Sequence, residues 1–180
     1  EASQQKAHIT ICSIYVNPTQ VNNRSDLENY PRTLVKDLEI LNKSGCDVVF
    51  LPGNNDIYPN GMEERLNIEL NGLDTTMEGA FRPGHFAGVI TVVNNLFSVV
   101  NPDFAFFGEK DFQQLSIIKQ LVKKTKRNIE IIGCTIIREK DGLAMSSRNQ
   151  LLSREERKVA PLLYQILCEV KERSSKYAVM

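Results

Sequence analysis

The amino-acid sequence predicts a doubly wound α/β domain built on a mainly parallel sheet. Short apolar runs rich in β-branched and aromatic residues alternate along the chain with longer segments whose apolar residues recur at helical spacing. Neighbouring parallel strands need long right-handed crossovers, and the helical segments supply them. The chain has 180 residues, 42% of them hydrophobic and 24% charged, which is enough for one sizeable core and excludes disorder.

The first part of the chain predicts a strand, a helix and a second strand. Residues 9–16 carry apolar side chains on both alternating faces, as in a strand covered by helices on both sides, and Asn17-Pro18 ends this strand. Residues 47–51 form the second strand. The helix between the strands has Gly45 as its C-terminal cap and leucines at helical spacing, namely Leu34, Leu38 and Leu41.

The middle of the chain predicts the same alternation again. Residues 66–70 predict a short strand that ends in the Asn71-Gly72 turn. Residues 89–100 trace one apolar helix face, and residues 104–107 form a buried strand. Asp111 can then cap a helix whose inward-facing residues are Leu115, Ile118 and Val122.

The last part of the chain predicts a further strand and a long amphipathic helix. Residues 129–133 form the strand, and Ile136-Ile137 is a short apolar stretch that leads into a polar loop. Ser153-Arg-Glu-Glu156 fits a capping box at the start of a helix. The apolar residues along one side of that helix are Val159, Leu162, Leu163, Ile166 and Val170.

Charge and cysteine content exclude several classes of protein. Basic and acidic residues both number 22, so no excess of charge favours nucleic acid or a membrane surface as a partner, and no apolar run is long enough to span a membrane. Four widely spaced cysteines and two histidines do not supply zinc-site spacing. Mostly buried, reduced thiols in a cytoplasmic protein are therefore expected.

Polar segments follow the predicted strands, where a parallel sheet binds its ligands. In such sheets, ligands lie beyond the carboxyl ends of the strands. Three segments have this position: residues 17–20, residues 108–111 and the loop 138–149. We expect the ligand site among them.

Residues 108–111 are the first candidate for phosphate binding. Backbone N–H groups, a helix N-terminus and the Lys110 ammonium can converge there on a phosphate. A surface turn with Asp111 as a cap is the alternative interpretation. Gln114, one turn into the next helix, can donate a hydrogen bond to a hydroxyl or carboxylate, or it can simply be solvated.

The segment from Asp141 to Asn149 is the second candidate. It joins a flexible glycine, the hydroxyls of Ser146 and Ser147, and the Arg148 guanidinium, a set suited to wrapping phosphates during transfer. The alternative is a capping serine pair beside a surface arginine. The segment 82–86 is interpreted as a rigid turn with a single histidine.

Five motifs follow one another over most of the chain. They are Asn17-Pro-Thr-Gln20, Tyr30-Pro-Arg-Thr33, Glu78-Gly-Ala-Phe-Arg-Pro-Gly-His-Phe86, Phe107-Gly-Glu-Lys-Asp-Phe-Gln-Gln114 and Asp141-Gly-Leu-Ala-Met-Ser-Ser-Arg-Asn149. In this order they resemble the motifs of the pantothenate synthetase (pantoate:β-alanine ligase) family, and five ordered motifs make the resemblance highly specific.

The resemblance implies a Rossmann-like domain of the nucleotidyltransferase type. It implies an enzyme that uses ATP with Mg²⁺ to adenylate pantoate, after which the β-alanine amine displaces AMP to give pantothenate. It also implies a homodimer built through the Rossmann-like part. Two alternatives stay open: a related nucleotidyltransferase that activates another small carboxylate, and a non-catalytic α/β domain that only binds nucleotide.

The resemblance also implies roles for individual residues. Gln20 and Gln114 would bind pantoate, with Gln20 also near β-alanine, and the Ile137 backbone would lie near adenine. Lys110 and Arg148 would stabilise phosphate charge. The other residues implied to line the ATP site are Gly108, Glu109, Asp111, Met145, Ser146 and Ser147.

The chain departs from the family pattern in three respects. The family's Pro-Thr-Met-Gly and His-x-Gly-His segments are absent, so no catalytic histidine is assigned, and His85 belongs to another motif. Val21 stands where the family has Phe. The family's closing C-terminal domain is also absent. These departures imply a central fragment, incomplete for activity, with a domain over residues 1–150 whose first strand is missing and a helix over 151–180 that leads into a further domain. No metal ligand is assigned.

Overall fold

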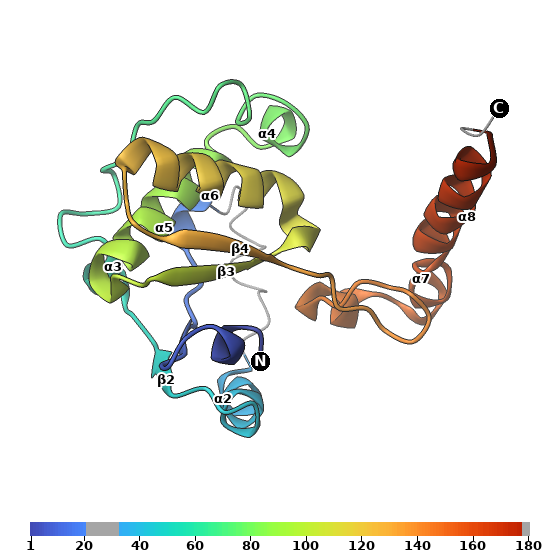
Figure 1. Cartoon of the computed structure of the whole chain (residues 1–180), viewed down its shortest axis with the longest axis horizontal. Coiled ribbons are helices and arrows are strands. Elements are labelled where there is room, and N and C mark those ends of the chain that lie inside the picture. Colours follow the sequence, from blue (N-terminus) through green and yellow to red (C-terminus); the bar gives the residue numbers. More distant parts are fainter. Residues whose placement is uncertain (21–32, 178–180) are drawn as a thin grey trace. The chain divides into compact units, whose positions relative to one another are not determined.

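The computed structural model of the chain describes residues 1–20 and 33–177 (Figure 1). The chain forms two compact units, Glu1–Cys134 and Thr135–Met180, and each is described by itself. Two features of the sequence, Val21 and residues 30–32 of the Tyr30 motif, lie outside the described residues.

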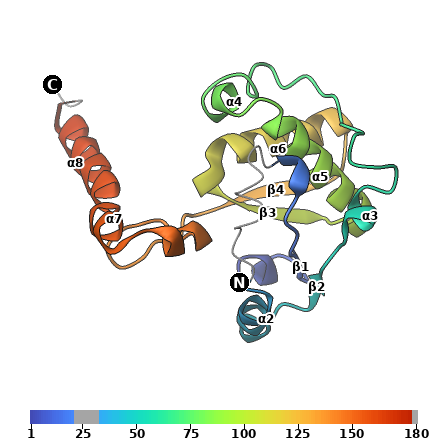
Figure 2. The ribbon, with the colours of Figure 1, turned by 180° about the vertical axis from the view of Figure 1, so that it is seen from behind.

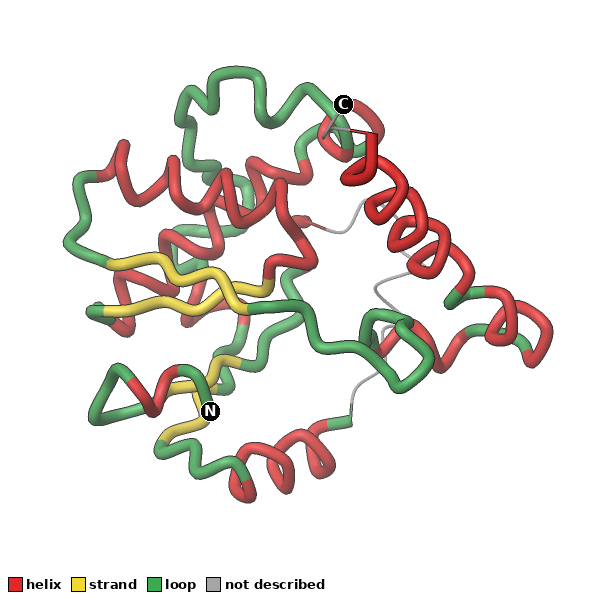
Figure 3. Tube along the Cα trace, turned by 45° about the vertical axis from the view of Figure 1, so that its right-hand side comes forward, coloured by secondary structure: helices red, strands yellow, loops and turns green. Residues whose placement is uncertain are grey.

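The first unit contains two pairs of parallel strands. Strand β1 (Ile11–Ser13) pairs with β2 (Val48–Phe50), and β3 (Phe104–Gly108) pairs with β4 (Glu130–Cys134). Figure 3 shows the two pairs as separate yellow ladders. The predicted parallel α/β architecture is confirmed.

Helices connect and cover these strands (Figures 1 and 2). Helix α2 (Leu34–Lys43) is the crossover from β1 to β2, and α6 (Phe112–Thr125) is the crossover from β3 to β4. The other helices that the described residues of the first unit form are η1 (Ser3–Gln5), η2 (Pro18–Gln20), α3 (Asn54–Ile57), α4 (Glu78–Phe81), α5 (His85–Val100) and η3 (Glu109–Asp111). Those of the second unit are η4 (Ser147–Leu151), α7 (Arg154–Val159) and α8 (Leu162–Tyr177).

Helices α5 and α6 form the centre of the core. They pack against each other, and α6 also packs on β3 and β4. Helix α5 begins at His85, before the predicted start at Val89, and Asn101 ends it in a left-handed conformation. The fully buried side chains at this contact are Phe86, Val89, Ile90, Ile117, Ile118 and Leu121. The core therefore fixes the two helices whose N-terminal ends carry the candidate motifs.

Strand β1 is shorter and more exposed than predicted. The sequence predicts a strand over residues 9–16 that is covered on both faces, whereas β1 spans three residues and Ile11 is 43% exposed. A groove of about 580 Å³, lined by β1, β3 and the C-terminal end of α5, runs along its free edge. Among the described residues no strand pairs with that edge.

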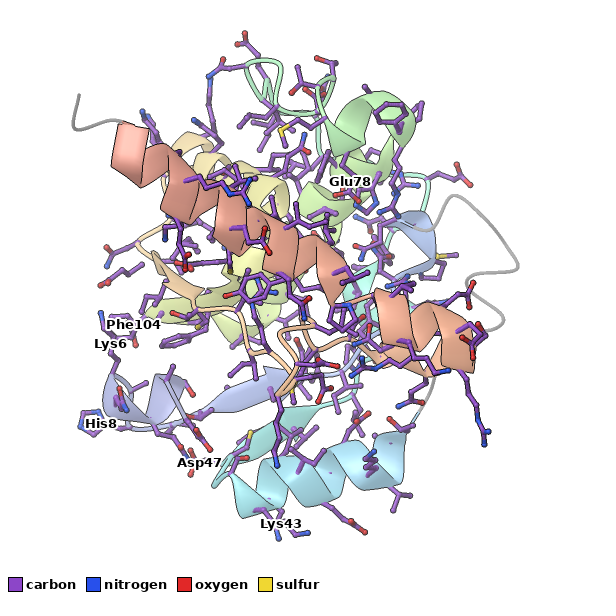
Figure 4. The ribbon with its side chains drawn as sticks, turned by 90° about the vertical axis from the view of Figure 1, so that its right-hand side faces the viewer. Lys6, His8, Lys43, Asp47, Glu78 and Phe104 are labelled. Atoms are coloured by element: carbon purple, nitrogen blue, oxygen red, sulfur yellow. The ribbon has the colours of Figure 1, made fainter. Side chains whose placement is uncertain are left out.

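The N-terminal segment lies at one end of this groove. The Lys6 ammonium is 5.7 Å from the centre of the Phe104 ring and 3.1 Å from the Glu130 carboxylate (Figure 4). The Gln4 side chain donates to the carbonyls of Ser44 and Gly45 at the end of α2. These contacts join the N-terminal segment to the β3–β4 pair and to the end of helix α2.

Two other expectations from the sequence differ in the structure. Residues 66–70 form no strand, because the Leu66 N–H donates to the Thr91 hydroxyl of α5 at 3.0 Å rather than to a ladder. The apolar stretch Ile136-Ile137 lies beyond the end of β4 at Cys134. The four cysteines, expected to be mostly buried, are free and half-buried.

The predicted helix after Ser153 is two helices. The capping box is confirmed: the Ser153 hydroxyl accepts from the Glu156 N–H, and the Glu156 carboxylate accepts from the Ser153 N–H. Helix α7 stops at Val159, and α8 begins after Pro161, which has no N–H to continue the helical ladder. The apolar side chains from Val159 to Val170 are exposed rather than packed. Among the described residues, no helix is long and apolar enough to cross a membrane.

Candidate active site

The turn after β3 presents the main group of candidate phosphate ligands. Residues Glu109–Asp111 form η3 and lead directly into α6, and all of 108–111 is exposed. Asp111 occupies the N-cap position of α6 as predicted, but its side chain makes no capping hydrogen bond. The first N–H groups of α6 are therefore not satisfied by this carboxylate, and such groups attract anions.

Two side chains of this turn differ in their surroundings. Lys110 has no ion-pair partner among the described residues, so its ammonium is available for a ligand. Glu109 turns back over β4, since a Cβ built on Gly133 would lie 3.2 Å from its Oε1. The glycine at position 133 therefore makes room for the Glu109 side chain.

Adjacent glutamines at the start of α6 have opposite environments. Gln113 is buried: its amide donates to the carbonyls of Leu73 and Thr76 at 2.6 and 2.8 Å, and its oxygen accepts from the Glu78 N–H at 3.0 Å. Gln114 is half-buried, and its side chain has no hydrogen-bond partner among the described residues. Gln113 therefore anchors a loop, and Gln114 is free to bind a ligand.

The Asn17–Gln20 turn after β1 packs closely on α5. Asn17 is 4% exposed, and its side-chain oxygen accepts from the Thr19 N–H and from the Tyr58 hydroxyl. The Asn17 amide donates to the side-chain oxygen of Gln20 at 3.1 Å. A Cβ on Gly88 of α5 would lie only 2.6 Å from the Thr19 carbonyl oxygen. Only glycine at this position permits the observed approach of the turn.

A polar cluster between α4 and α5 holds the backbone of Gln20. The Gln20 carbonyl accepts from Arg82 Nη2 at 3.1 Å and lies 2.8 Å from His85 Nδ1. Arg82 also pairs with Glu78 at 2.5 Å, and His85 Nε2 lies 3.8 Å from the same carboxylate oxygen. Burial lowers the pKa of His85, which favours the neutral imidazole. Figure 4 labels Glu78, the first residue of α4.

These contacts link the two glutamines that the motifs single out. The chain of contacts runs from the Gln20 carbonyl through Arg82 to Glu78, and from the Glu78 N–H to Gln113, the neighbour of Gln114. Gln20 follows β1, and Gln114 lies on the helix that follows β3. The first unit therefore connects both segments through a chain of hydrogen bonds.

The second unit carries the remaining candidate residues in a short hairpin and the turn after it. Arg138 and Ala144 form an antiparallel bridge, and the Ile137 carbonyl accepts from the Met145 N–H at 3.0 Å. The Arg138 guanidinium stacks 3.6 Å above the Tyr164 ring. Gly142 has a φ of +93°, which favours glycine at this turn.

Residues Ser146, Ser147 and Arg148 follow this hairpin. The Ser146 hydroxyl accepts from the Arg148 N–H at 3.3 Å and so caps η4. This is the capping role that the sequence offered as the alternative interpretation for a serine of the pair. Ser147 and Arg148 form the first residues of η4.

Sequence reasoning missed the contribution of three side chains. Gln113, Arg82 and His85 act on candidate site segments through contacts far along the chain, 35 to 65 residues away. The signal available was the presence of Arg82 and His85 in one of the five motifs. Among the described residues, no three histidine, cysteine or carboxylate side chains are grouped to hold a metal ion.

Parallel strands with helical crossovers, and a polar turn leading into a helix at the end of β3, define an α/β domain of the nucleotidyltransferase type. The chain belongs to the pantoate-beta-alanine ligase family, whose model matches residues 1–180.

Solved structures of this family have the same fold. Pantothenate synthetase from Thermus thermophilus is 42% identical, with a TM-score of 0.91 over 97% of this chain. Pantoate-beta-alanine ligase from Francisella tularensis, complexed with beta-gamma ATP and beta-alanine, is 42% identical, with a TM-score of 0.86 over 92% of this chain. The chain spans 63% of the length of each relative.

Proposed function

We propose that the full-length gene product is an ATP-dependent ligase that joins pantoate and β-alanine to make pantothenate. Family membership supports this reaction, and the related Francisella tularensis enzyme was solved with beta-gamma ATP and beta-alanine. The reaction releases AMP and pyrophosphate and proceeds through pantoyl adenylate.

One observation carries the proposal: Gln114, beside the Gly108–Asp111 turn, has a side chain with no partner among the described residues, although its neighbour Gln113 is fully hydrogen-bonded. An amide near the end of a parallel strand is well placed to recognise a hydroxyl or a carboxylate. The contacts described above tie this helix to Gln20, the other glutamine that we assign to pantoate.

The proposed reaction has two steps. A carboxylate oxygen of pantoate attacks the α-phosphorus of ATP in line, and the bond from that phosphorus to the pyrophosphate oxygen breaks. The amine of β-alanine then attacks the carbonyl carbon of the adenylate, AMP leaves with the bonding electrons, and the nitrogen loses a proton to solvent. Lys110 and Arg148 stabilise the negative charge that builds on the phosphates in the first step.

The remaining site residues are proposed from the motifs. Gly108, Glu109 and Asp111 line the ATP site with Lys110, and the Ile137 backbone lies near adenine. Met145, Ser146 and Ser147 act with Arg148 on the phosphates. Gln20 contacts both pantoate and β-alanine.

Mg²⁺ is proposed to enter with ATP. It usually binds through substrate phosphates with only one or two protein carboxylates, so it needs no preformed cluster of three protein ligands. No residue of the chain is assigned to it. The metal would neutralise phosphate charge, while the residues above orient the nucleotide.

We further propose that the enzyme is cytoplasmic and is a homodimer formed through its α/β part. Residues 1–150 are proposed as the domain that binds ATP and pantoate. Residues 151–180 are proposed as a helical segment that leads into a further domain. Size-exclusion chromatography with light scattering tests the dimer.

Pyrophosphate release tests the reaction. The full-length protein is mixed with ATP, Mg²⁺ and pantoate, and pyrophosphate is measured before and after addition of β-alanine. AMP and pantothenate detected by mass spectrometry are the expected products. Release that depends on a different carboxylate favours a related nucleotidyltransferase, and ATP binding without release favours a non-catalytic domain.

A further inference from the structure

The backbone and side chain of Gln20 are held separately. Its carbonyl accepts from Arg82 Nη2 at 3.1 Å and faces His85 Nδ1 at 2.8 Å. Its side-chain oxygen accepts from the buried Asn17 amide at 3.1 Å. The Gln20 amide nitrogen has no partner among the described residues, so it remains the group that can donate to a ligand.

The geometry points to His85 as a positioning residue that, together with Arg82, fixes the Gln20 backbone so that the Gln20 amide donates to pantoate. This inference rests on the proposed function. A carbonyl oxygen can only accept, so the 2.8 Å contact requires a proton on His85 Nδ1. His85 is only 6% exposed at the first position of α5, and its ring is packed 4.9 Å from that of Phe86.

Rigid support explains why a histidine is useful at this position. Gln20 lies at the end of a three-residue 3₁₀ turn that has no regular ladder of its own. A side chain locked in a helix and in the core transfers that rigidity to the turn through one short hydrogen bond. Arg82 adds a second donor to the same oxygen, and Glu78 holds the Arg82 guanidinium in place.

Two substitutions of His85 distinguish its ring nitrogens. The amide nitrogen of His85→Asn can replace Nδ1, whereas the longer side chain of His85→Gln places its amide near the position of Nε2. In the full-length protein we expect His85→Gln to raise the KM for pantoate about tenfold, with the KM for ATP changed less than about twofold. His85→Asn should restore most of this loss. Thermal unfolding confirms that each variant is folded.

Arg82→Met provides a variant at a less buried position. It keeps the aliphatic stem but removes the donor, and we expect a smaller selective rise in the KM for pantoate. Equal increases in both KM values for the His85 and Arg82 variants, or no better recovery with Asn than with Gln, would overturn the inference.

A spectroscopic measurement tests the contact without activity. In ¹⁵N-labelled protein, the histidine signals that disappear in His85→Asn should belong to a neutral ring protonated at Nδ1. A ring protonated only at Nε2 would refute the contact. If the parent protein releases no pyrophosphate with pantoate, the proposed function and the role in pantoate binding both fail, while a normal parent with unselective variants refutes the positioning role alone.

Discussion

The hydroxyl of Tyr58 donates a 2.8 Å hydrogen bond to the side-chain oxygen of Asn17, and both residues are only 4% exposed. Tyr58 ends helix α3, and Asn17 begins the turn after β1. The bond thus ties the segment after β2 to the turn that carries Gln20.

Tyr58→Phe should reduce the free energy of unfolding by about 1–2 kcal/mol, because it removes the hydroxyl that donates to Asn17 and that also lies 3.0 Å from the Thr19 hydroxyl, while it leaves the ring in place. Tyr15→Phe is the matched control, since the Tyr15 hydroxyl donates to Asn54 at a more exposed site. Urea unfolding of both variants provides the comparison. If Tyr58→Phe is as stable as the parent, the Tyr58 hydroxyl does not stabilise the protein.

Gln114→Leu and Gln20→Leu should raise the KM for pantoate about tenfold and leave the KM for ATP nearly unchanged. Each change removes an amide that can donate to pantoate. Steady-state kinetics of pyrophosphate release measure both constants. If both substrates respond alike, these glutamines do not recognise pantoate.

Gln113→Leu is the neighbouring control with the opposite expected outcome. It removes three buried hydrogen bonds to the loop 73–78, so the protein should lose about 1–3 kcal/mol of stability. Gln114→Leu should change the unfolding midpoint little. Comparable unfolding midpoints for the two variants would contradict the distinction between an anchoring and a ligand-binding glutamine.

Lys110→Ala in the full-length protein should slow pyrophosphate release about tenfold to a hundredfold, because a charge-assisted contact to phosphate contributes roughly 1.5–3 kcal/mol. Lys119→Ala, at an exposed position of α6 away from the turn, is the control. Release at the parent rate would place Lys110 outside the phosphate site.

Stability should fall in mild acid because of His85. Burial lowers the pKa of His85 below its ordinary value of 6.5, so the unfolded chain takes up a proton more readily than the folded one. This contribution is fully present above about pH 6.5 and is lost as the pH decreases toward the lower folded pKa. Urea midpoints at about pH 7.5 and about pH 5.5 should differ less in His85→Asn than in the parent, and an unchanged difference would contradict the role of His85.

Gly142→Ala should destabilise the second unit more than Gly61→Ala destabilises the first. Both glycines have positive φ angles, +93° and +97°, but a Cβ at position 142 would lie 2.6 Å from the Tyr164 ring, while position 61 opens onto free space. Both changes introduce the backbone strain of a non-glycine residue at positive φ, about 1 kcal/mol, and Gly142→Ala adds a steric clash. Limited proteolysis of both variants measures the difference, with cleavage in the 138–144 hairpin for Gly142→Ala and around residue 61 for Gly61→Ala, and equal increases in cleavage would exclude the clash.

The local sequence pattern predicts those elements whose hydrogen bonds and packing contacts join residues that are close together in the sequence. The helix between the first two strands, the strand after Asn101-Pro102 and the Ser153 capping box all depend on spacing within a few turns of the chain. Residues 66–70 are predicted as a strand because their apolar pattern is the same whether the partner is a strand or, as found, the hydroxyl of Thr91. The group that accepts from the Leu66 N–H determines whether this segment is a strand, and sequence spacing does not identify that group.

The candidate site shows the same limit. Ordered motifs identify Gln20 and Gln114, since each lies in a recognisable segment. The pattern Gln113-Gln114 does not reveal which amide is buried, because that depends on the carbonyls of Leu73 and Thr76, about 40 residues away. His85 is interpreted from the sequence as part of a turn for the same reason: its partner is 65 residues distant.

The groove beside β1 makes amide exchange a direct reporter of strand pairing. The Ile14 N–H donates to β2, so by the two-residue period of a strand the N–H groups of Ile11 and Ser13 turn toward the groove. On the other side of the groove, the Asp103 carbonyl accepts from the Glu130 N–H of β4. By the same two-residue period, the N–H groups of Phe104 and Phe106 turn away from β4 and toward the groove.

These amides should exchange with deuterium much faster than their immediate neighbours in the ladders. An alternating pattern of fast and slow exchange along β1 and β3 would follow. If another extended segment were seated in the groove, the alternation would vanish first at these positions, and both strands would become protected together.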